Sequence, residues 1–426
     1  MHPEKCVNQA TVRNAVLNAA GESFWGLQTA LVSSATVLTV LLTRLGSGPL
    51  LISSISAIEA GGIVIPQIFG VYIFGSAAQR KKRIILWHWF VMIPFLFFMG
   101  LLVCCGSSVP KLFERWALLF FFGCFNVSIG IVSAIWMDWL AHLYDTKSRG
   151  TVMGIGFGCS ATTGIFGGLL AGKIIRGFHD TSEYGYLYLA AGLIAFLSIS
   201  LFWFINDSAI KTEPNDPAPQ LRALINDFNE SLRHANFRAF LVGRLLATAG
   251  FCILPFVTVY YTSATGGGLS DGAVVSCGSA QAAGFALANI LLGRLGDRFG
   301  HRVGLMIGAG MQVVTMGIVL TGAGTIRCVC AFASVGVCIS AGLVSHYNML
   351  FETCPHANRT AHIAAGNFII GLGVIVFPVL AGLTIARWGL PVVFTISAII
   401  SAGALVWFMF FVKEPRRSQN NNFAVT

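Results

Sequence analysis

Long stretches of this chain contain no Asp, Glu, Lys or Arg, and they are long enough to cross a membrane. Examples are residues 150–172, 184–205, 303–326 and 391–412. About 20 apolar residues, at a rise of about 1.5 Å each, cross the hydrocarbon core of a bilayer as a helix. A large soluble helical bundle would need polar faces on its outer helices, and the sequence does not provide them. We therefore predict an all-α polytopic membrane protein.

The composition and the pattern of apolar segments support twelve membrane-spanning helices. Charged residues make up 10% of the 426 residues, against about 25% in an ordinary soluble domain, and the mean hydropathy is +0.76. The first apolar segment is too long for a cleavable signal peptide. The predicted spans are 16–42, 49–75, 84–105, 116–141, 150–173, 184–206, 238–262, 271–292, 303–323, 327–349, 361–385 and 390–412.

The basic residues indicate how these spans are oriented. If the N-terminus is cytosolic, the inner segments hold 19 of the 27 Lys and Arg, the outer loops hold seven, and Arg244 lies within a span. This positive-inside bias predicts a multi-pass protein of the plasma membrane, the inner membrane in a bacterium, with both termini cytosolic. The net charge of +10 is then an orientation signal that can contact anionic lipid, so we expect no nucleic-acid partner.

A long connection after the sixth span divides the chain into two halves. It contains the helix-breaking segment EPNDPAP. Apolar residues then recur at helical spacing, which predicts an amphipathic helix on the inner membrane face: Leu221, Leu224, Ile225, Phe228 and Leu232. The predicted organisation is an N-terminal six-helix bundle (1–206), a cytosolic linker (207–237), a C-terminal six-helix bundle (238–413) and a cytosolic tail (414–426).

The two halves resemble each other in sequence. The segment RGTVMGIGFGCSATTGIFGGLLAGKII starts at Arg149, and RTAHIAAGNFIIGLGVIVFPVLAGLTI starts at Arg359. Both follow an inner loop, and both carry the tripeptide LAG at the same offset, at 170–172 and 380–382. Because six is an even number of spans, the halves insert in the same orientation. Parallel, pseudo-symmetric six-helix bundles are an architecture of transporters.

The segment GRLGDRFGHR, after the eighth span, carries a family resemblance. It closely resembles the signature of the major facilitator superfamily in the inner loops after the second and eighth helices, and with the topology the resemblance covers nearly the whole chain. The motif residues are Gly293, Gly296, Asp297, Arg298, Gly300 and Arg302. The stretch WMDWLAHLYDTKSRG, from Trp136, is similar to a loop of many poorly characterised bacterial members.

We expect the motif to form a tight inner turn that gates transport. Glycines allow helix ends to approach closely, and Asp297 is an anion suited to a helix N-terminus. The resemblance implies that this partner is the start of the fifth helix, near Gly150 and Thr151. The alternative is a positive-inside anchor with an incidental Asp. The equivalent loop of the first half, GVYIFGSAAQRKKR, keeps the basic cluster but has no acid at that position.

Polar residues within the spans are the candidate substrate and coupling site, since ionisable groups at membrane depth are costly. The resemblance implies that the first, fourth, seventh and tenth helices line a central cavity. Glu22 is the leading proton-coupling candidate and Glu59 the alternative, because loss of water makes a charged carboxylate costly. Trp25 can stack on a sugar, an aromatic ring or a cation. The full set is Glu22, Trp25, Gln28, Glu59, Asn126, Asp138, Arg244, Gln281 and Asn367.

Each of these residues also has a purely structural interpretation. Glu22 can be satisfied by an internal hydrogen bond, and Trp25 and Glu59 can simply pack. Asp138 can pair with Lys147 or Arg149, and Arg244 can extend to the inner surface. Asn126, Gln281 and Asn367 can each be a helix–helix contact.

The sequence favours a transporter over the other classes. The cysteine spacings do not suit zinc, and no hydrolase triad, phosphate loop or metal cluster is present, so we expect neither an enzyme nor a cofactor or metal. We expect a monomeric, proton-coupled secondary transporter of a small solute that works by alternating access. A multidrug/proton efflux antiporter is one alternative, although GIFGG at 164–168 lacks the proline of the drug-antiporter signature. A non-transporting membrane sensor on the same fold is another.

The topology is tested by single cysteines introduced at Ser76 and at Ser107. Because the positive-inside bias places these positions on opposite faces, a membrane-impermeant thiol reagent should label Ser107→Cys from outside intact cells. It should label Ser76→Cys only after the cells are opened. Labelling of both positions from the same side would overturn the topology.

Overall fold

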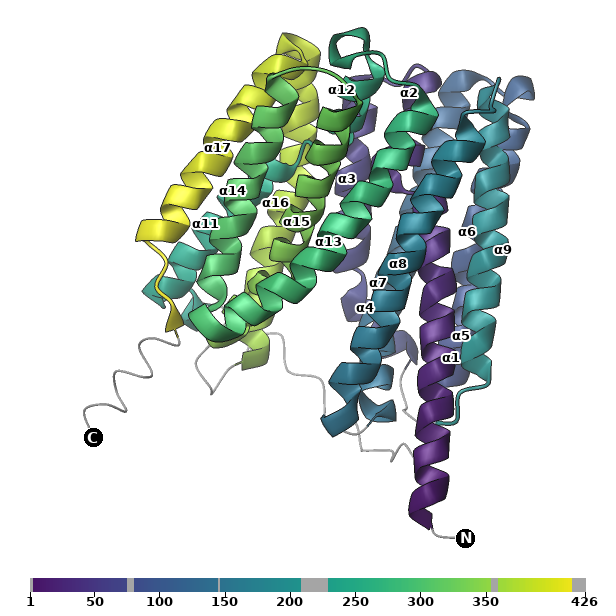
Figure 1. The fold of residues 1–426 in the computed structure, drawn as a ribbon, viewed down its shortest axis with the longest axis vertical. Coiled ribbons are helices and arrows are strands. Elements are labelled where there is room, and N and C mark those ends of the chain that lie inside the picture. Colours follow the sequence, from purple (N-terminus) through teal and green to yellow (C-terminus); the bar gives the residue numbers. More distant parts are fainter. Residues whose placement is uncertain (1–2, 75–79, 145, 208–228, 354–358, 416–426) are drawn as a thin grey trace. The chain divides into compact units, whose positions relative to one another are not determined.

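The chain folds almost entirely into helices that run through two compact units (Figure 1). The computed structural model describes residues 3–74, 80–144, 146–207, 229–353 and 359–415. Within these ranges every regular element is helical. The amphipathic helix predicted from Leu221 to Leu232 falls mostly on 208–228, which lie outside the described residues.

The first half of the sequence forms long helices joined by short turns. Its α-helices are α1 (Pro3–Leu31), α2 (Thr39–Arg44), α3 (Pro49–Val64), α4 (Gln67–Phe74), α5 (Arg80–Trp87), α6 (Ile93–Cys104), α7 (Lys111–Leu143), α8 (Thr146–Ile175) and α9 (Tyr184–Trp203). Two π-helical turns, η1 (Ser34–Leu38) and η3 (His88–Met92), and two 3-10 turns, η4 (Gly106–Ser108) and η5 (Thr181–Glu183), connect them.

The second half repeats this plan with fewer interruptions. Its α-helices are α11 (Ala235–Phe251), α12 (Leu254–Thr262), α13 (Asp271–Phe299), α14 (His301–Leu320), α15 (Thr325–Glu352), α16 (Arg359–Trp388) and α17 (Leu390–Phe410). One 3-10 turn, η6 (Ala264–Gly266), follows α12.

The helices confirm the all-helical membrane fold predicted from the sequence. Among the described residues, 11 helical segments are long and apolar enough to cross a membrane. The remaining predicted span, 49–75, is split between α3 and α4, because Pro66 cannot continue a helix without losing a hydrogen bond. The span 238–262 is likewise split after Phe251. Irregular turns of this kind are tolerated at membrane depth where protein covers them.

The two compact units follow the sequence halves except at two short segments. Unit 1 comprises 1–47, 58–216 and 270–279, and unit 2 comprises 48–57, 217–269 and 280–426. The beginning of α13 therefore packs with the first half, and the beginning of α3 packs with the second half.

Helix packing within unit 1 depends on glycines that let backbones approach closely. In Figure 1, α1 (purple) runs beside α8 and α9. A side chain at Gly26 would overlap the backbone of Ser160 on α8. Nearby, the Thr163 hydroxyl donates to the carbonyl of Ser23 at 2.6 Å, and the Ser198 hydroxyl of α9 donates to the carbonyl of Gly21 at 2.7 Å. Small residues and hydroxyls are the usual means by which helices associate in membranes.

Unit 2 is packed mainly by aromatic and aliphatic side chains of α11, α15 and α17. Phe237, Phe240, Met349, Leu350 and Phe408 are all fully buried in one cluster. The indole of Trp407 on α17 also donates to the carbonyl of Ala239 on α11, at 2.8 Å. This bond satisfies the one polar atom of a large apolar side chain.

The repeated LAG tripeptide has an equivalent packing role in each unit. In unit 1, a side chain at Gly172 of α8 would overlap Gly272 and Ser276 of α13. In unit 2, a side chain at Gly382 of α16 would overlap Ser53 of α3. The sequence repeat therefore marks two helix crossings at which only glycine fits.

Gly172→Ala should destabilise the protein although alanine is the better helix former. The added methyl group meets the backbone of Gly272, so the helices must separate, and overpacking of this kind costs about 1–3 kcal/mol. Gly158→Ala on the same helix is the matched control, because its methyl group would enter open space. Thermal unfolding in detergent should show a lower Tm for Gly172→Ala only. Equal Tm values for the two variants would contradict this packing role.

Candidate functional site

The candidate site in unit 1 centres on the polar face of α1. Asn18 and Glu22 lie one turn apart and are buried, at 2% and 8% exposure. Gly156 of α8 packs against both side chains. No hydrogen bond or ion pair to Glu22 is present in the described part of the chain, and the Asn18 Oδ1 is buried without a partner. Because unsatisfied buried polar groups are costly, this pair is a strong candidate for a functional site.

Asn14, one turn before Asn18 on the same face, has a different role. Its Nδ2 donates to the carbonyl of Asn206 at 2.7 Å, and its Oδ1 accepts from the Asn206 N–H at 2.9 Å. In unit 2, Asn236 forms the same two bonds with the backbone of Lys413, at 3.0 and 2.7 Å. The first helix of each half is thus joined to the segment after the sixth helix.

Trp25 and Gln28 lie further along α1. The Trp25 ring meets the ring of His88 edge-on at 6.1 Å, and His88 meets Trp136 at 6.0 Å. Trp25 is half-buried, and Gln28 is 1% exposed. Trp25 therefore belongs to an aromatic cluster, which agrees with its packing interpretation.

Two other candidates from the first half occupy helix–helix contacts, and a third is not described. The Glu59 carboxylate accepts a hydrogen bond from the Ser34 hydroxyl at 2.7 Å. The Asn126 amide donates to Phe122 in its own helix at 2.8 Å, and its Cβ packs against Gly62 of α3. The Asp138 side chain lies outside the described residues.

In unit 2 the structure groups two candidates around a histidine. The terminal nitrogens of Arg244 on α11 lie beside Gly342 of α15, one turn before His346. The His346 Nε2 lies 3.3 Å from the Asn367 Oδ1 on α16. Gln281 of α13 is half-buried, and its Oε1 is buried without a partner among the described residues.

The signature motif differs from the predicted turn. Gly293, Gly296, Asp297 and Arg298 belong to the last turns of α13, which continues to Phe299 rather than ending near residue 292. The turn itself is Gly300, with φ +91°, a value that L side chains rarely adopt. The expectation of a multi-residue turn was therefore wrong, because the helix continues through the charged residues.

Glu414 is a partner of the motif that sequence reasoning missed. Its carboxylate accepts from the backbone N–H of Arg302 at 2.9 Å, in the first turn of α14, and the Arg302 guanidinium donates to the carbonyl of Val412 at 2.8 Å. A side chain at Gly300 would occupy the space of that carboxyl group. An acid at a helix N-terminus is stabilised by the free N–H groups.

The first half has a comparable contact despite its altered motif. Lys81, in the basic cluster, forms an ion pair with Asp207 at 3.1 Å. Asp207 follows Asn206, just as Glu414 follows Lys413. Both acids occupy the same position in their half of the sequence, directly after the residue whose backbone is bound by Asn14 or Asn236. This equivalence could have identified them from the sequence.

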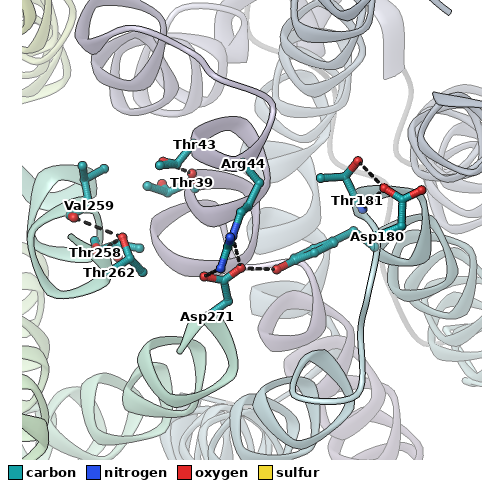
Figure 2. A network of polar contacts seen from close by, with 10 residues as sticks. Thr39, Thr43, Arg44, Asp180, Thr181, Thr258, Val259, Thr262 and Asp271 are labelled. Atoms are coloured by element: carbon teal, nitrogen blue, oxygen red, sulfur yellow. Dashed lines mark hydrogen bonds and ion pairs between the residues drawn. The ribbon is translucent and has the colours of Figure 1, made fainter. Parts of the chain in front are cut away.

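A second polar network in unit 1 lies at the other end of α1–α2 and was also missed. Figure 2 shows Arg44 of α2 facing Asp271, the first residue of α13. The guanidinium donates twice, from Nε at 2.6 Å and from Nη2 at 2.9 Å, and the Tyr184 hydroxyl donates to the same carboxylate at 3.0 Å. A bidentate arginine–carboxylate pair is geometrically specific, so it fixes the start of α13 within unit 1.

Two further observations concern the ionisable side chains of the described residues as a whole. The backbone N–H of Thr181 donates to the exposed Asp180 carboxylate and lowers its pKa (Figure 2). Within the described ranges, no three His, Cys, Asp or Glu residues are placed to hold a metal ion together.

Comparison with known proteins gives a family match over the second half. Residues 239–425 match the model of the Major Facilitator Superfamily. No curated protein matches the chain in sequence.

Solved structures match the chain over nearly its full length. A mutant of the nucleoside transporter NupG is 12% identical, with a TM-score of 0.73, and the match covers 95% of this chain and 100% of that one. A D-xylose-proton symporter is 17% identical, with a TM-score of 0.64, covering 95% and 98%. A POT family peptide transporter is 12% identical, with a TM-score of 0.62, covering 95% and 98%.

These matches confirm the resemblance seen in the signature motif. The second half shows it by sequence, and the helices show it over 95% of the chain by fold. The second half of the chain therefore matches this superfamily by sequence, and the described helices have the fold of these solved transporters; with 11 helical segments that can cross a membrane, the chain is a multi-pass membrane protein.

Proposed function

We propose that this protein is a secondary active transporter that moves a small solute by alternating access and couples this movement to protons. The fold supports transport, and the structural neighbours include a nucleoside transporter, a D-xylose-proton symporter and a peptide transporter. The observation that carries the proposal is Glu22, a buried carboxyl group with no hydrogen-bond partner in the described structure.

Glu22 suits proton exchange better than Glu59 does. A carboxylate held by donors is stabilised in its charged form, whereas a buried carboxylate without donors is not. Glu59 accepts a hydrogen bond from Ser34 at 2.7 Å. Glu22 packs against Gly156 of α8, and no donor to its carboxyl group is present among the described residues. Its protonation therefore depends on whether water reaches it, and that access changes in an alternating-access cycle.

Transport is tested with purified protein in sealed vesicles. Uptake of radiolabelled uridine, D-xylose, a dipeptide and lactate is measured with and without an imposed pH gradient. Solute accumulation above the equilibrium level, driven by the gradient and abolished by a protonophore, supports the proposal. A protein that is stabilised by a solute but does not carry it across the membrane would instead be a sensor on this fold.

Glu22→Gln should uncouple transport without abolishing it. The neutral amide cannot exchange a proton, so solute exchange across the vesicle membrane should persist, while gradient-driven accumulation should fall to a ratio of about one. Glu59→Gln is the matched control and should keep the wild-type accumulation ratio. If Glu22→Gln accumulates solute as well as the wild type does, Glu22 is not the coupling group, and the same measurement decides on Glu59.

For Asp297 we propose a gating role at the inner side. Asp297→Asn removes the charge without changing the shape, so the protein should fold but favour the state that is closed to the outside. A cysteine introduced at Thr29, an exposed position one turn beyond Trp25, reports this state through its rate of labelling by an impermeant thiol reagent. The rate should fall severalfold in Asp297→Asn, but not in Asp180→Asn. An unchanged rate would exclude the gating role.

A further inference from the structure

Arg244 is a half-buried positive charge for which the described residues provide no counter-charge. It lies about 14 Å along α11 from the first residue of that helix, at a rise of about 1.5 Å per residue. Its Nε is buried and has no hydrogen-bond partner, and the residues that the structure describes offer it no ion pair. An arginine that simply extends to the membrane surface keeps its polar head in water. Burial of a cation without an anion is costly.

A glycine lies beside the terminal nitrogens of this guanidinium. Gly342 of α15 faces it, and a Cβ at that position would lie 3.8 Å from Nη2 and 4.0 Å from Nη1. Because glycine has no side chain, residue 342 places no side-chain atom against these two donor nitrogens, and they are not among the buried atoms. A carboxylate group can accept from two nitrogens of one guanidinium, which is the strongest geometry for this pair.

The residues around these nitrogens hold a second polar group in a fixed orientation. His346 lies one turn after Gly342, on the same face of α15. Its ring stacks on Phe240 at 5.6 Å, with 16° between the planes, and Phe240 lies one turn before Arg244 on α11. The Nε2 of His346 faces Asn367, while its Nδ1 is buried without a partner among the described residues. The site therefore combines a bidentate donor, an imidazole nitrogen and an aromatic wall.

From this geometry we infer that Arg244, Gly342 and His346 form a binding site for the carboxylate group of a small monoanionic solute. Arg244 is the only cation within it, so a single negative charge gives a neutral complex. A dianionic phosphate would bring an excess charge into apolar surroundings. The inference rests on the proposed function in that it takes the bound solute to be the transported one, but binding itself can be measured without transport.

Binding is tested by thermal unfolding of the purified full-length protein at about pH 8.5, where inorganic phosphate is mainly the dianion and the carboxylates and Arg244 stay charged. The probes are sodium acetate, lactate and benzoate, with sodium chloride at equal ionic strength as the reference and sodium phosphate as the dianion. A ligand that binds only the folded state raises Tm in a saturable, concentration-dependent manner. We expect at least one carboxylate to do so, and chloride and phosphate to have no saturable effect.

Two variants assign the binding to this site. Arg244→Gln removes the charge and should weaken carboxylate binding roughly 10- to 100-fold. Gly342→Leu keeps the arginine but places a large side chain against its terminal nitrogens, and it should abolish the saturable shift even if Arg244→Gln does not fold. Arg387→Gln, an exposed arginine in the last turn of α16, is the matched control and should bind as the wild type does.

The outcomes separate this inference from the transport proposal. Carboxylate binding that persists in both Arg244→Gln and Gly342→Leu overturns the site. Saturable binding of phosphate or chloride that requires Arg244 overturns the assignment to a carboxylate. Gradient-driven uptake of a neutral solute without any carboxylate binding overturns this inference alone. Arg244-dependent carboxylate binding without uptake keeps the site and overturns transport.

Discussion

The close approach of α1 and α8 is the contact on which the rest of unit 1 depends. Lipid chains are as apolar as the side chains they contact, so helices gain little from hydrophobic burial alone and associate through small residues. Gly26 allows α1 to lie against the backbone of Ser160, and Gly156 allows Asn18 and Glu22 to be buried against α8. The same packing that stabilises the helix pair therefore removes water from a carboxyl group, which is what proton coupling requires.

Both halves use one arrangement to hold the end of their sixth helix. In each half, an asparagine on the first helix binds the backbone N–H and carbonyl of one residue after the sixth helix. The residue that follows this bound residue is an acid, Asp207 or Glu414, and it contacts the basic segment after the second or eighth helix. The acid meets a lysine side chain in unit 1 and the N-terminus of α14 in unit 2. The loss of the motif acid in the first half thus leaves this contact in place, because it uses a different carboxylate, that of Asp207.

Each unit contains one charged residue of the candidate site for which the described residues provide no partner. Glu22 in unit 1 lacks a donor, and Arg244 in unit 2 lacks an anion, as far as the described residues extend. Asn14, Glu59 and Asn126 differ from these two residues, because each has a hydrogen-bond partner. A protein tolerates such uncompensated groups where a proton or a solute completes them.

The sequence by itself determined the helical membrane fold and most of the spans, and it indicated the family resemblance of the second half, because hydrophobicity and signature motifs are properties of short segments. The sequence also identified Glu22 and Arg244 as candidate residues of the substrate and coupling site. It could not assign different roles to Asn14 and Asn18, which share one helix face. Asn14 is hydrogen-bonded to Asn206 and Asn18 packs against Gly156, and both of these partners are distant in the sequence. The sequence placed the helix end before Asp297 and missed Glu414 and Asp271, since their partners come from other helices. Only the tertiary structure decides which buried polar groups are satisfied, because the atoms that satisfy them are brought together by folding.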